Sequence, residues 1–160
     1  MPLTDVAPIS ASIEVAAPPA EVWAQVSDLR NMAQWSPQTV KSFLRGENGA
    51  GARFLNVNRM GVKVWPTQSK VVRFEAPTAS TPGEIAWRVK ENFTIWSLKL
   101  EPTADGGTTL TSTREAPEGI SDLSVRLTKV MFGGVPKFTS TLQSDMAETL
   151  KKIKATVESA

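Results

Sequence analysis

The stretch GARFLNVNRMGVKVWPTQSKVV, residues 51–72, alternates apolar and polar side chains on both sides of Gly61 and Val62. This period of two predicts a pair of antiparallel strands joined by a two-residue turn at these positions. In such a hairpin, residues that lie opposite each other share one face. One face then carries Phe54, Asn56, Asn58, Trp65, Thr67, Ser69 and Val71, and the other carries Leu55, Val57, Arg59, Val64, Pro66, Gln68 and Lys70.

The first of these faces mixes aromatic, amide and hydroxyl groups, as ligand sites do when a few polar groups stand in mainly apolar walls. Burying Asn56 and Asn58 without partners would cost roughly 1–3 kcal/mol each. Either these amides therefore bond to each other and to the backbone, or they face water or a polar group of a ligand. In the alternative interpretation this face is exposed on an edge hairpin and the opposite face is buried.

Strand periodicity continues on both sides of the hairpin, with turn signals such as TADGG at residues 103–107 between the segments. Trp87 and Trp96 each stand among aliphatic neighbours on one face, which core packing or an apolar pocket wall would both explain. In the last strand Thr111, Thr113 and Glu115 share a face, and Arg114 is on the other. The predicted strands are 9–16, 38–46, 52–60, 63–75, 84–90, 93–102 and 108–116.

Helical spacing appears near both ends of the chain. Pro18 and Pro19 suit the entry of a short helix that places Trp23 in the core, and a second short turn at 31–35 ends with Trp35. A segment capped by Ser121 and a longer helix that begins at Pro136 are predicted to cover the sheet. The apolar stripe of the longer helix consists of Phe138, Leu142, Met146, Leu150, Ile153 and Val157.

Composition excludes several kinds of site. The 160 residues contain no His, Cys or Tyr, so Ser-His-Asp and Cys-His nucleophile pairs and His- or Cys-based metal sites cannot form. The net charge is +2, and the basic cluster at residues 151–154 suits the end of a helix better than nucleic acid. No apolar run approaches the roughly 20 residues that span a bilayer, and no signal peptide is recognisable. We expect one cytoplasmic domain, residues 1–160 with a core at about 9–158, without nucleic-acid binding or stable membrane insertion.

Four segments together resemble the START/Bet v 1-like superfamily, also called SRPBCC or the polyketide cyclase/dehydrase-like group. They are PPAEVWAQVSDLRNMAQWSP (18–37), the hairpin at 51–72, IWSLKLEPTADGGTTLTSTRE (95–115) and the ending TLKKIK (149–154). The resemblance implies an α+β helix-grip fold. In this fold a curved antiparallel sheet of about seven strands, two short helices and a long C-terminal helix enclose a cavity.

The resemblance implies that a small hydrophobic molecule such as a lipid, polyketide or isoprenoid is bound for transport, sequestration or sensing. The alternatives are a polyketide aromatase/cyclase-type enzyme and a START-like module that binds a chaperone or another protein partner. In the enzyme, Arg59 or Arg114 would stabilise an oxyanion and Glu115 would transfer protons, although the lack of His and Tyr counts against it.

The residues expected to bind the ligand come from the mixed hairpin face, the later strands and the covering helices. Neither a cofactor nor a metal is expected, and both a monomer and a homodimer are compatible with the sequence. The candidate ligand-binding residues are Trp35, Phe54, Asn56, Asn58, Trp65, Thr67, Trp87, Trp96, Thr111, Thr113, Met131, Phe138, Leu142 and Met146.

Overall fold

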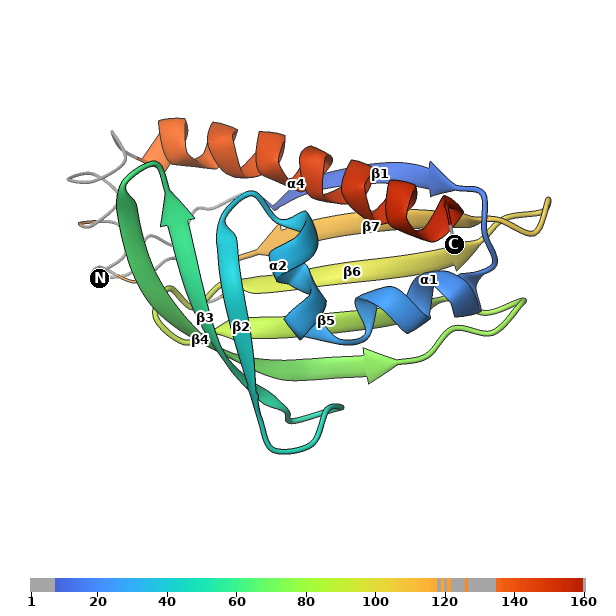
Figure 1. Ribbon diagram of the computed structural model, residues 1–160, viewed down its shortest axis with the longest axis horizontal. Helices are drawn as coiled ribbons and strands as arrows, with labels where there is room; N and C mark the ends of the chain where they lie inside the picture. The colour runs from blue at the N-terminus through green and yellow to red at the C-terminus, as the bar shows by residue number, and fades with distance from the viewer. Residues whose placement is uncertain (1–7, 118, 120, 122–125, 127–134, 160) are drawn as a thin grey trace.

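A seven-stranded antiparallel sheet forms the body of the protein in a computed structural model that describes residues 8–117, 119, 121, 126 and 135–159 (Figure 1). The strand order is β1-β7-β6-β5-β4-β3-β2, so that β1 and β2 are the two edges. All seven predicted strands are confirmed, with ends that shift by at most two residues. Their bounds are β1 Ile9–Val15, β2 Thr39–Arg45, β3 Arg53–Met60, β4 Lys63–Glu75, β5 Gly83–Val89, β6 Ile95–Pro102 and β7 Thr108–Glu115.

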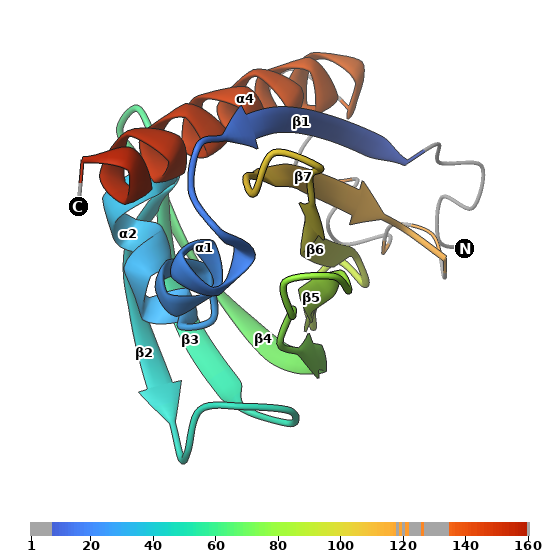
Figure 2. The same ribbon diagram turned by 90° about the vertical axis from the view of Figure 1, so that its right-hand side faces the viewer.

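The helices lie on the concave side of this sheet. Helix α1 (Pro19–Val26), a 3-10 turn η1 (Leu29–Asn31) and α2 (Met32–Trp35) connect the edge strands β1 and β2, and α4 spans Val135–Glu158. Figure 2 shows the sheet curving around α1 and α2, with α4 lying alongside β1. This is the helix-grip arrangement that the superfamily resemblance implies.

The β3–β4 hairpin has the predicted register. Asn58 pairs with Trp65 and Asn56 pairs with Thr67 across the two strands. Gly61 takes a φ of +64° at the first turn position, a conformation that suits glycine in a two-residue hairpin turn. The two faces of the hairpin are therefore the ones deduced from the alternation.

Helix α1 follows from its sequence. Pro19 stands in its first turn, where a missing N–H costs nothing, and Val22 and Val26 are buried on its inner side. Trp23 is half-buried, and its ring meets that of Phe74 edge-on, with centroids 5.0 Å apart. Trp23 therefore packs at the border of the core, close to the place that the helical spacing predicts.

The core lies between the sheet and the helices, and Trp35 is part of it. This side chain is 2% exposed, and its indole Nε1 donates a hydrogen bond of 3.2 Å to Thr156 Oγ1 on α4. Trp35 thus attaches α2 to the C-terminal half of the long helix. Other fully buried core side chains are Phe54, Ile85, Leu98, Leu100, Leu110, Leu150 and Ile153.

Part of the predicted covering layer lies outside the described residues. The segment that Ser121 was expected to cap is in this part of the chain, as is Met131, and the side chain of Phe138 is also outside the description. Ser121 itself donates a hydrogen bond of 2.7 Å from its hydroxyl to the carbonyl oxygen of Glu91.

Candidate functional site

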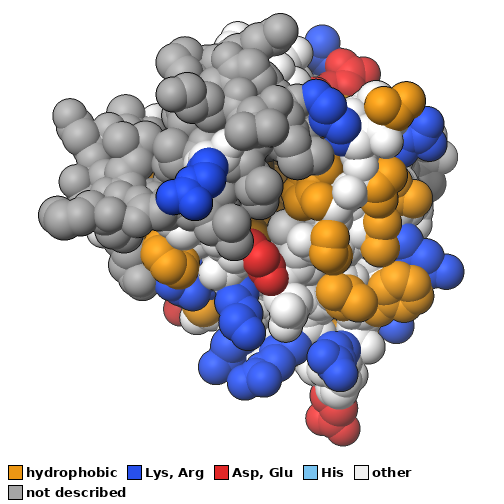
Figure 3. Space-filling model, turned by 90° about the vertical axis from the view of Figure 1, so that its left-hand side faces the viewer, with side chains coloured by type: hydrophobic (Ala, Val, Ile, Leu, Met, Phe, Trp, Pro, Cys, Tyr) orange, Lys and Arg blue, Asp and Glu red, His pale blue; other side chains and the backbone are white. Residues whose placement is uncertain are grey.

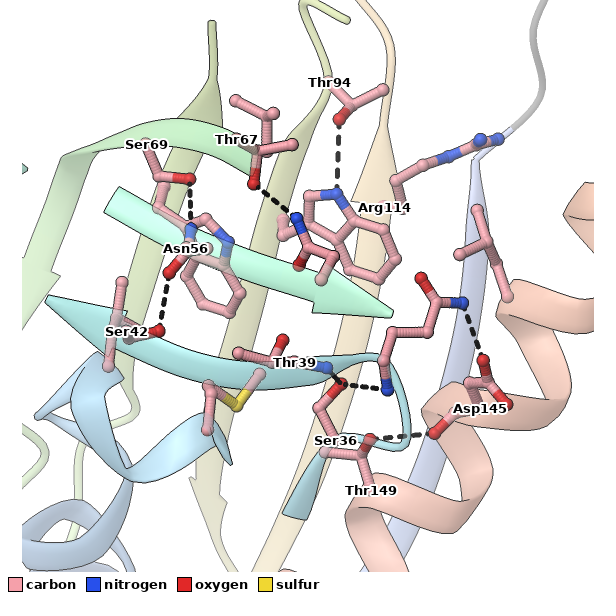
Figure 4. A pocket seen from close by; sticks show the side chains of 18 of the residues that line it. Ser36, Thr39, Ser42, Asn56, Thr67, Ser69, Thr94, Arg114, Asp145 and Thr149 are labelled. Carbon is pink, nitrogen blue, oxygen red and sulfur yellow. Dashed lines mark hydrogen bonds between the residues drawn. The ribbon is translucent and has the colours of Figure 1, made fainter. Parts of the chain in front are cut away.

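A cavity of about 180 Å³ lies between the inner face of the sheet and the helices α2 and α4 (Figure 4). Strands β2 to β7 all contribute side chains to it, because the curved sheet turns its concave face toward α4. The walls differ in chemistry: one is polar, one is aromatic, one is formed by the helices, and a single arginine lies on β7.

The polar wall is formed by amides and hydroxyls on β2, β3 and β4. Ser42 Oγ donates a hydrogen bond of 2.6 Å to Asn56 Oδ1, and Asn56 Nδ2 donates one of 3.1 Å to Ser69 Oγ. Asn58 Nδ2 donates to Thr67 Oγ1 at 2.9 Å. The two amides therefore have hydroxyl partners in the protein, which reduces the cost of burying them and fixes their orientation.

The aromatic wall consists of Trp65, Trp87 and Trp96. Trp87 and Trp96 are cross-strand partners on β5 and β6. The indole Nε1 of Trp96 donates a hydrogen bond of 3.2 Å to Thr94 Oγ1, whose hydroxyl donates to Asn92 Oδ1 at 2.5 Å. These indoles provide large, rigid apolar surfaces, because each has only two rotatable side-chain bonds.

The helical wall is closed by contacts between α4 and the segment after α2. Gln38 Nε2 donates a hydrogen bond of 2.6 Å to Asp145 Oδ2 on α4, and Thr149 Oγ1 donates to the carbonyl oxygen of Asp145 at 2.8 Å. Leu142 and Met146 add apolar surface from the same helix.

Arg114 on β7 differs from the other described lining residues because it is a buried cation whose Nε has no hydrogen-bond partner among them. It is the cross-strand partner of Trp96 and is 3% exposed. Its Nε is fully buried, and no hydrogen-bond acceptor or carboxylate among the described residues reaches it. Burial lowers the pKa of the guanidinium below its usual value, since desolvation disfavours the charged form. Arginine nevertheless remains charged in proteins.

Residues 7–158 match the protein family described as "Polyketide cyclase / dehydrase and lipid transport". The chain belongs to this family. A search of curated proteins finds no match to the sequence. The family membership agrees with the superfamily resemblance and with the helix-grip architecture.

Solved structures with the same fold include proteins with different names and uses. The di-domain ARO/CYC StfQ from the steffimycin biosynthetic pathway aligns with a TM-score of 0.72 at 13% identity, over 95% of this chain and 50% of that one. A STAR-related lipid transfer protein from Xanthomonas axonopodis gives 0.67 at 14%, over 93% and 84%. Ara h 8.0201 gives 0.64 at 15%, over 96% and 99%. At these identities the likeness establishes the fold alone.

In this member of the family, most of the ligand-binding candidates that the structure describes are brought together. Four are not: Thr111 and Thr113 are on the outer side of the sheet, and Trp35 and Phe54 are on the inner side but pack in the core and do not line the cavity. The candidates at the cavity are Asn56, Asn58, Trp65, Thr67, Trp87, Trp96, Leu142 and Met146.

The two β7 threonines among the candidates lie on the other face of the sheet from the cavity. Thr111 and Thr113 point away from the cavity, and Thr111 Oγ1 shares a hydrogen bond of 2.8 Å with Ser12 Oγ on the outer side of the sheet. Glu115 is exposed on the same outer side. Ser112 and Arg114 line the cavity instead, because the inward face of β7 is the one that carries the fully buried Leu110.

Of the three candidate catalytic side chains, Arg114 alone lines the cavity. Arg59 is exposed on the outer face of β3, and its Nε donates a hydrogen bond of 2.8 Å to the carbonyl oxygen of Gly61. Arg59 and Glu115 are therefore not positioned to act on a molecule in the cavity.

Several lining residues were not predicted. Ser42 and Ser69 could have been found from the sequence, because Ser69 is on the mixed hairpin face and β2 pairs with β3. Asp145 and Thr149 follow Leu142 on α4 at helical spacing, but polar residues at such positions usually face solvent. Asn92 and Thr94 are in the β5–β6 turn, where Phe93 has a φ of +67° that no sequence pattern indicates.

Two kinds of feature are absent from the described part of the chain. It contains no cluster of three or more His, Cys, Asp or Glu side chains that could hold a metal ion. Among the described residues, no helix is both long and apolar enough to span a bilayer.

Proposed function

We propose that this protein binds a small, mainly apolar molecule with an acidic group in the cavity, as a carrier or sensor. The family, which is described by both cyclase/dehydrase activity and lipid transport, supports an apolar ligand. The observation that carries the proposal is Arg114, a buried cation on the cavity wall without a partner among the described residues.

A bound acid would supply the partner that Arg114 lacks among the described residues. An uncompensated buried charge is strongly unfavourable, and a carboxylate would form charge-assisted hydrogen bonds with the guanidinium, whose planar fork fits two carboxylate oxygens. Because Trp96 is the cross-strand neighbour of Arg114, the apolar part of the ligand would lie against the indoles.

The size of the cavity limits the part of the ligand that it encloses. A dry apolar cavity of about 150 Å³ takes up benzene. The volume of about 180 Å³ in this protein therefore suits one or two rings or a short aliphatic chain. The hydroxyls and amides of the polar wall would bond to keto or hydroxyl groups on the ligand.

Native mass spectrometry of the freshly purified protein is the first test. An extra mass that is released on denaturation would be the occupant, and we expect its formula to contain a carboxylic acid or another acidic oxygen. An occupant with neither an acidic group nor substantial apolar surface would contradict the proposal.

A matched pair of probes separates binding from recognition of the acid. We expect 2-naphthoic acid to bind about 10–100-fold more tightly than the neutral 2-naphthalenemethanol, as measured by calorimetry, because a hydrogen bond to a charged group contributes about 1.5–3 kcal/mol. Arg114→Gln should abolish this preference and retain binding of the alcohol, whereas Arg59→Gln, on the outer face, should change neither. Equal affinities in the wild type would overturn the role of Arg114. A lack of binding of both compounds would overturn the cavity as a binding site for molecules of this class.

A second function, polyketide cyclisation, is favoured by the same arginine. In this case a poly-β-ketone chain would lose an α proton to Asp145, the carboxylate among the described lining residues. Arg114 would stabilise the enolate oxygen while the enolate carbon attacks a carbonyl of the same chain, and the resulting alkoxide would take the proton back from Asp145 to become a hydroxyl. Cyclisation of a poly-β-ketone thioester that Asp145→Asn abolishes and that Glu115→Gln leaves intact would support this function. Equal rates with and without the protein would exclude it for that substrate.

A further inference from the structure

The outer face of the hairpin, opposite the cavity, carries a row of three basic residues. Arg45 on β2 pairs with Arg53 on β3, and Arg53 pairs with Lys70 on β4. All three side chains are exposed, and no acidic partner from the described residues forms an ion pair with any of them. We call Arg45, Arg53 and Lys70 the basic row.

The basic row is unfavourable for the folded sheet. Directly opposed side chains are about 4.5–5.5 Å apart at Cβ, and like charges at this distance destabilise the pair. Charged residues on an edge strand help to prevent aggregation, which accounts for Arg45 on β2. It does not account for Arg53 and Lys70, because β3 and β4 have neighbours on both sides.

Apolar side chains are exposed directly beside the basic row. The next cross-strand pair on the same face is Phe43 with Leu55, which are 45% and 37% exposed. Lys41 Nζ lies 5.2 Å from the centre of the Phe43 ring, so another cation is next to this pair. Toward the turn, Val64 is 58% exposed and Val62 is 93% exposed.

Hydrophobic and basic side chains therefore gather on one surface of the molecule. Viewed from the side of the β3–β4 turn, hydrophobic side chains lie together next to Lys and Arg, and acidic side chains are fewer (Figure 3). The outward positions of β2, β3 and the first part of β4, up to Lys70, include Lys41, Arg45, Arg53, Arg59 and Lys70, and no Asp or Glu. Single exposed apolar residues are ordinary, but a contiguous set bordered by one sign of charge marks an interaction site.

We infer that this face docks on the surface of an anionic lipid bilayer. Lys and Arg are attracted to negatively charged headgroups, and neighbouring apolar side chains enter the boundary with the acyl chains. Phe43, Leu55 and Val64 favour a bilayer over a nucleic-acid duplex, because contacts to the phosphates make no use of apolar side chains. A second copy of the chain is disfavoured, because a two-fold contact on this face would bring two basic rows together.

This inference goes beyond the proposed function and does not depend on it. The cavity is lined by the inward side chains of the same strands, such as Asn56 and Thr67, whereas the docking face consists of their outward neighbours. A change on one face therefore leaves the other in place.

Vesicle co-sedimentation tests the basic row. The wild type should bind vesicles of phosphatidylcholine with phosphatidylglycerol, should release them as the salt concentration rises, and should ignore vesicles of phosphatidylcholine alone. The variant R45Q/R53Q/K70Q should bind the anionic vesicles about a hundredfold less. The control K99Q/K151Q/K152Q removes the same charge from exposed positions elsewhere and should bind like the wild type.

Three outcomes would overturn the inference. Equal losses in the two triple variants would show that net charge alone matters. Equal binding to neutral and anionic vesicles would remove the role of the basic row. Binding to a DNA duplex that depends on the basic row, without binding to vesicles, would assign the face to nucleic acid.

A double variant tests the apolar part of the face. Phe43→Ser with Leu55→Ser should weaken binding to the anionic vesicles and leave the dependence on salt unchanged, because the cations remain. Unchanged vesicle binding in this variant would contradict insertion of the apolar pair. Thermal unfolding and binding of 2-naphthoic acid would check that each variant is folded.

Discussion

Arg114 combines two properties that do not normally occur together in a stable core. It is almost completely buried, and no acceptor from the described residues reaches its Nε. Buried charges in proteins are usually paired, because removing a charge from water without compensation is expensive. Such a residue is explained if a bound ligand forms hydrogen bonds with the guanidinium. In the protein without ligand, the same residue lowers the stability of the fold.

Replacing Arg114 by leucine should therefore stabilise the protein without ligand. We expect an increase of about 1–3 kcal/mol in the free energy of unfolding, measured by urea denaturation, because buried charges can often be replaced by apolar side chains with a gain of this size. Lys99→Leu, at an exposed position on β6, should change stability by less than about 0.5 kcal/mol. A loss of several kcal/mol in Arg114→Leu would instead mean that the guanidinium supports the fold.

At the level of elements, the β3–β4 hairpin was predictable down to its register. Its two strands carry clear alternation, and a two-residue turn at Gly61 and Val62 fixes which residues are opposite each other. The sequence therefore identified Asn56, Asn58, Trp65 and Thr67 as one surface. The hairpin sequence alone could not show that this surface faces inward. Its direction follows from the curvature of the whole sheet, which places α4 on the concave side.

Strand β7 illustrates why the rest of the site was not predictable. Both of its faces carry polar side chains: threonines are on one face, and Ser112 and Arg114 are on the other together with Leu110. A charged residue suggests an outward face, yet Leu110 was the better guide because it is fully buried. Arg114 faces inward because it is the cross-strand partner of Trp96, which in turn pairs with Trp87 on the inner face of the sheet. These pairings between strands cannot be read from the sequence of β7 alone.

The C-terminal end of α4 is held to β1 by an acidic residue. Glu158 Oε2 accepts hydrogen bonds from the backbone N–H of Ala16 at 2.8 Å and from Lys154 Nζ at 2.7 Å. These bonds lower the pKa of the Glu158 carboxyl below its ordinary value of 4.5, the bond to Ala16 contributing most. Lys154 Nζ also donates to the carbonyl oxygen of Glu14, so Glu158 and Lys154 together connect the end of α4 to the end of β1 and the residue after it.

This arrangement predicts a dependence of stability on pH. A carboxyl group whose pKa is lowered by folding stabilises the protein fully above its unfolded pKa of about 4.5, and the stabilisation is lost as the pH falls through the lower folded value. Glu158→Gln should therefore be less stable than the wild type at pH 7 in thermal unfolding, and the difference should shrink as the pH falls below 4.5 and through the lower folded pKa. Glu148→Gln, at an exposed position of the same helix, should show no such difference. A difference in stability that stays constant from pH 7 into the acid range, down to the lowest pH at which both proteins fold, would contradict this assignment.

At the scale of the whole molecule, β2, β3 and β4 separate two surfaces of different character. Their inward side chains contribute amides and hydroxyls to the cavity, and their outward side chains form the basic and apolar face. A ligand that moves between a bilayer and the cavity would have to pass around this sheet. It could not pass between the strands, because packed side chains such as Phe54 fill the inner face. The two surfaces should therefore be separable by mutation.

Ligand-induced stabilisation tests that separation in the intact protein. A ligand that binds only the folded state at a hundred times its Kd raises the free energy of unfolding by about 2.7 kcal/mol, which corresponds to an increase in Tm of roughly 5–11 °C for a chain of this size. We expect 2-naphthoic acid to produce this increase in the wild type and equally in R45Q/R53Q/K70Q, because the basic row lies outside the cavity. Arg114→Gln should lose most of the increase with the acid and respond to 2-naphthalenemethanol as the wild type does. If the basic-row variant lost the response to the acid, the outer face and the cavity would be energetically coupled, and the two surfaces would not be separable by mutation.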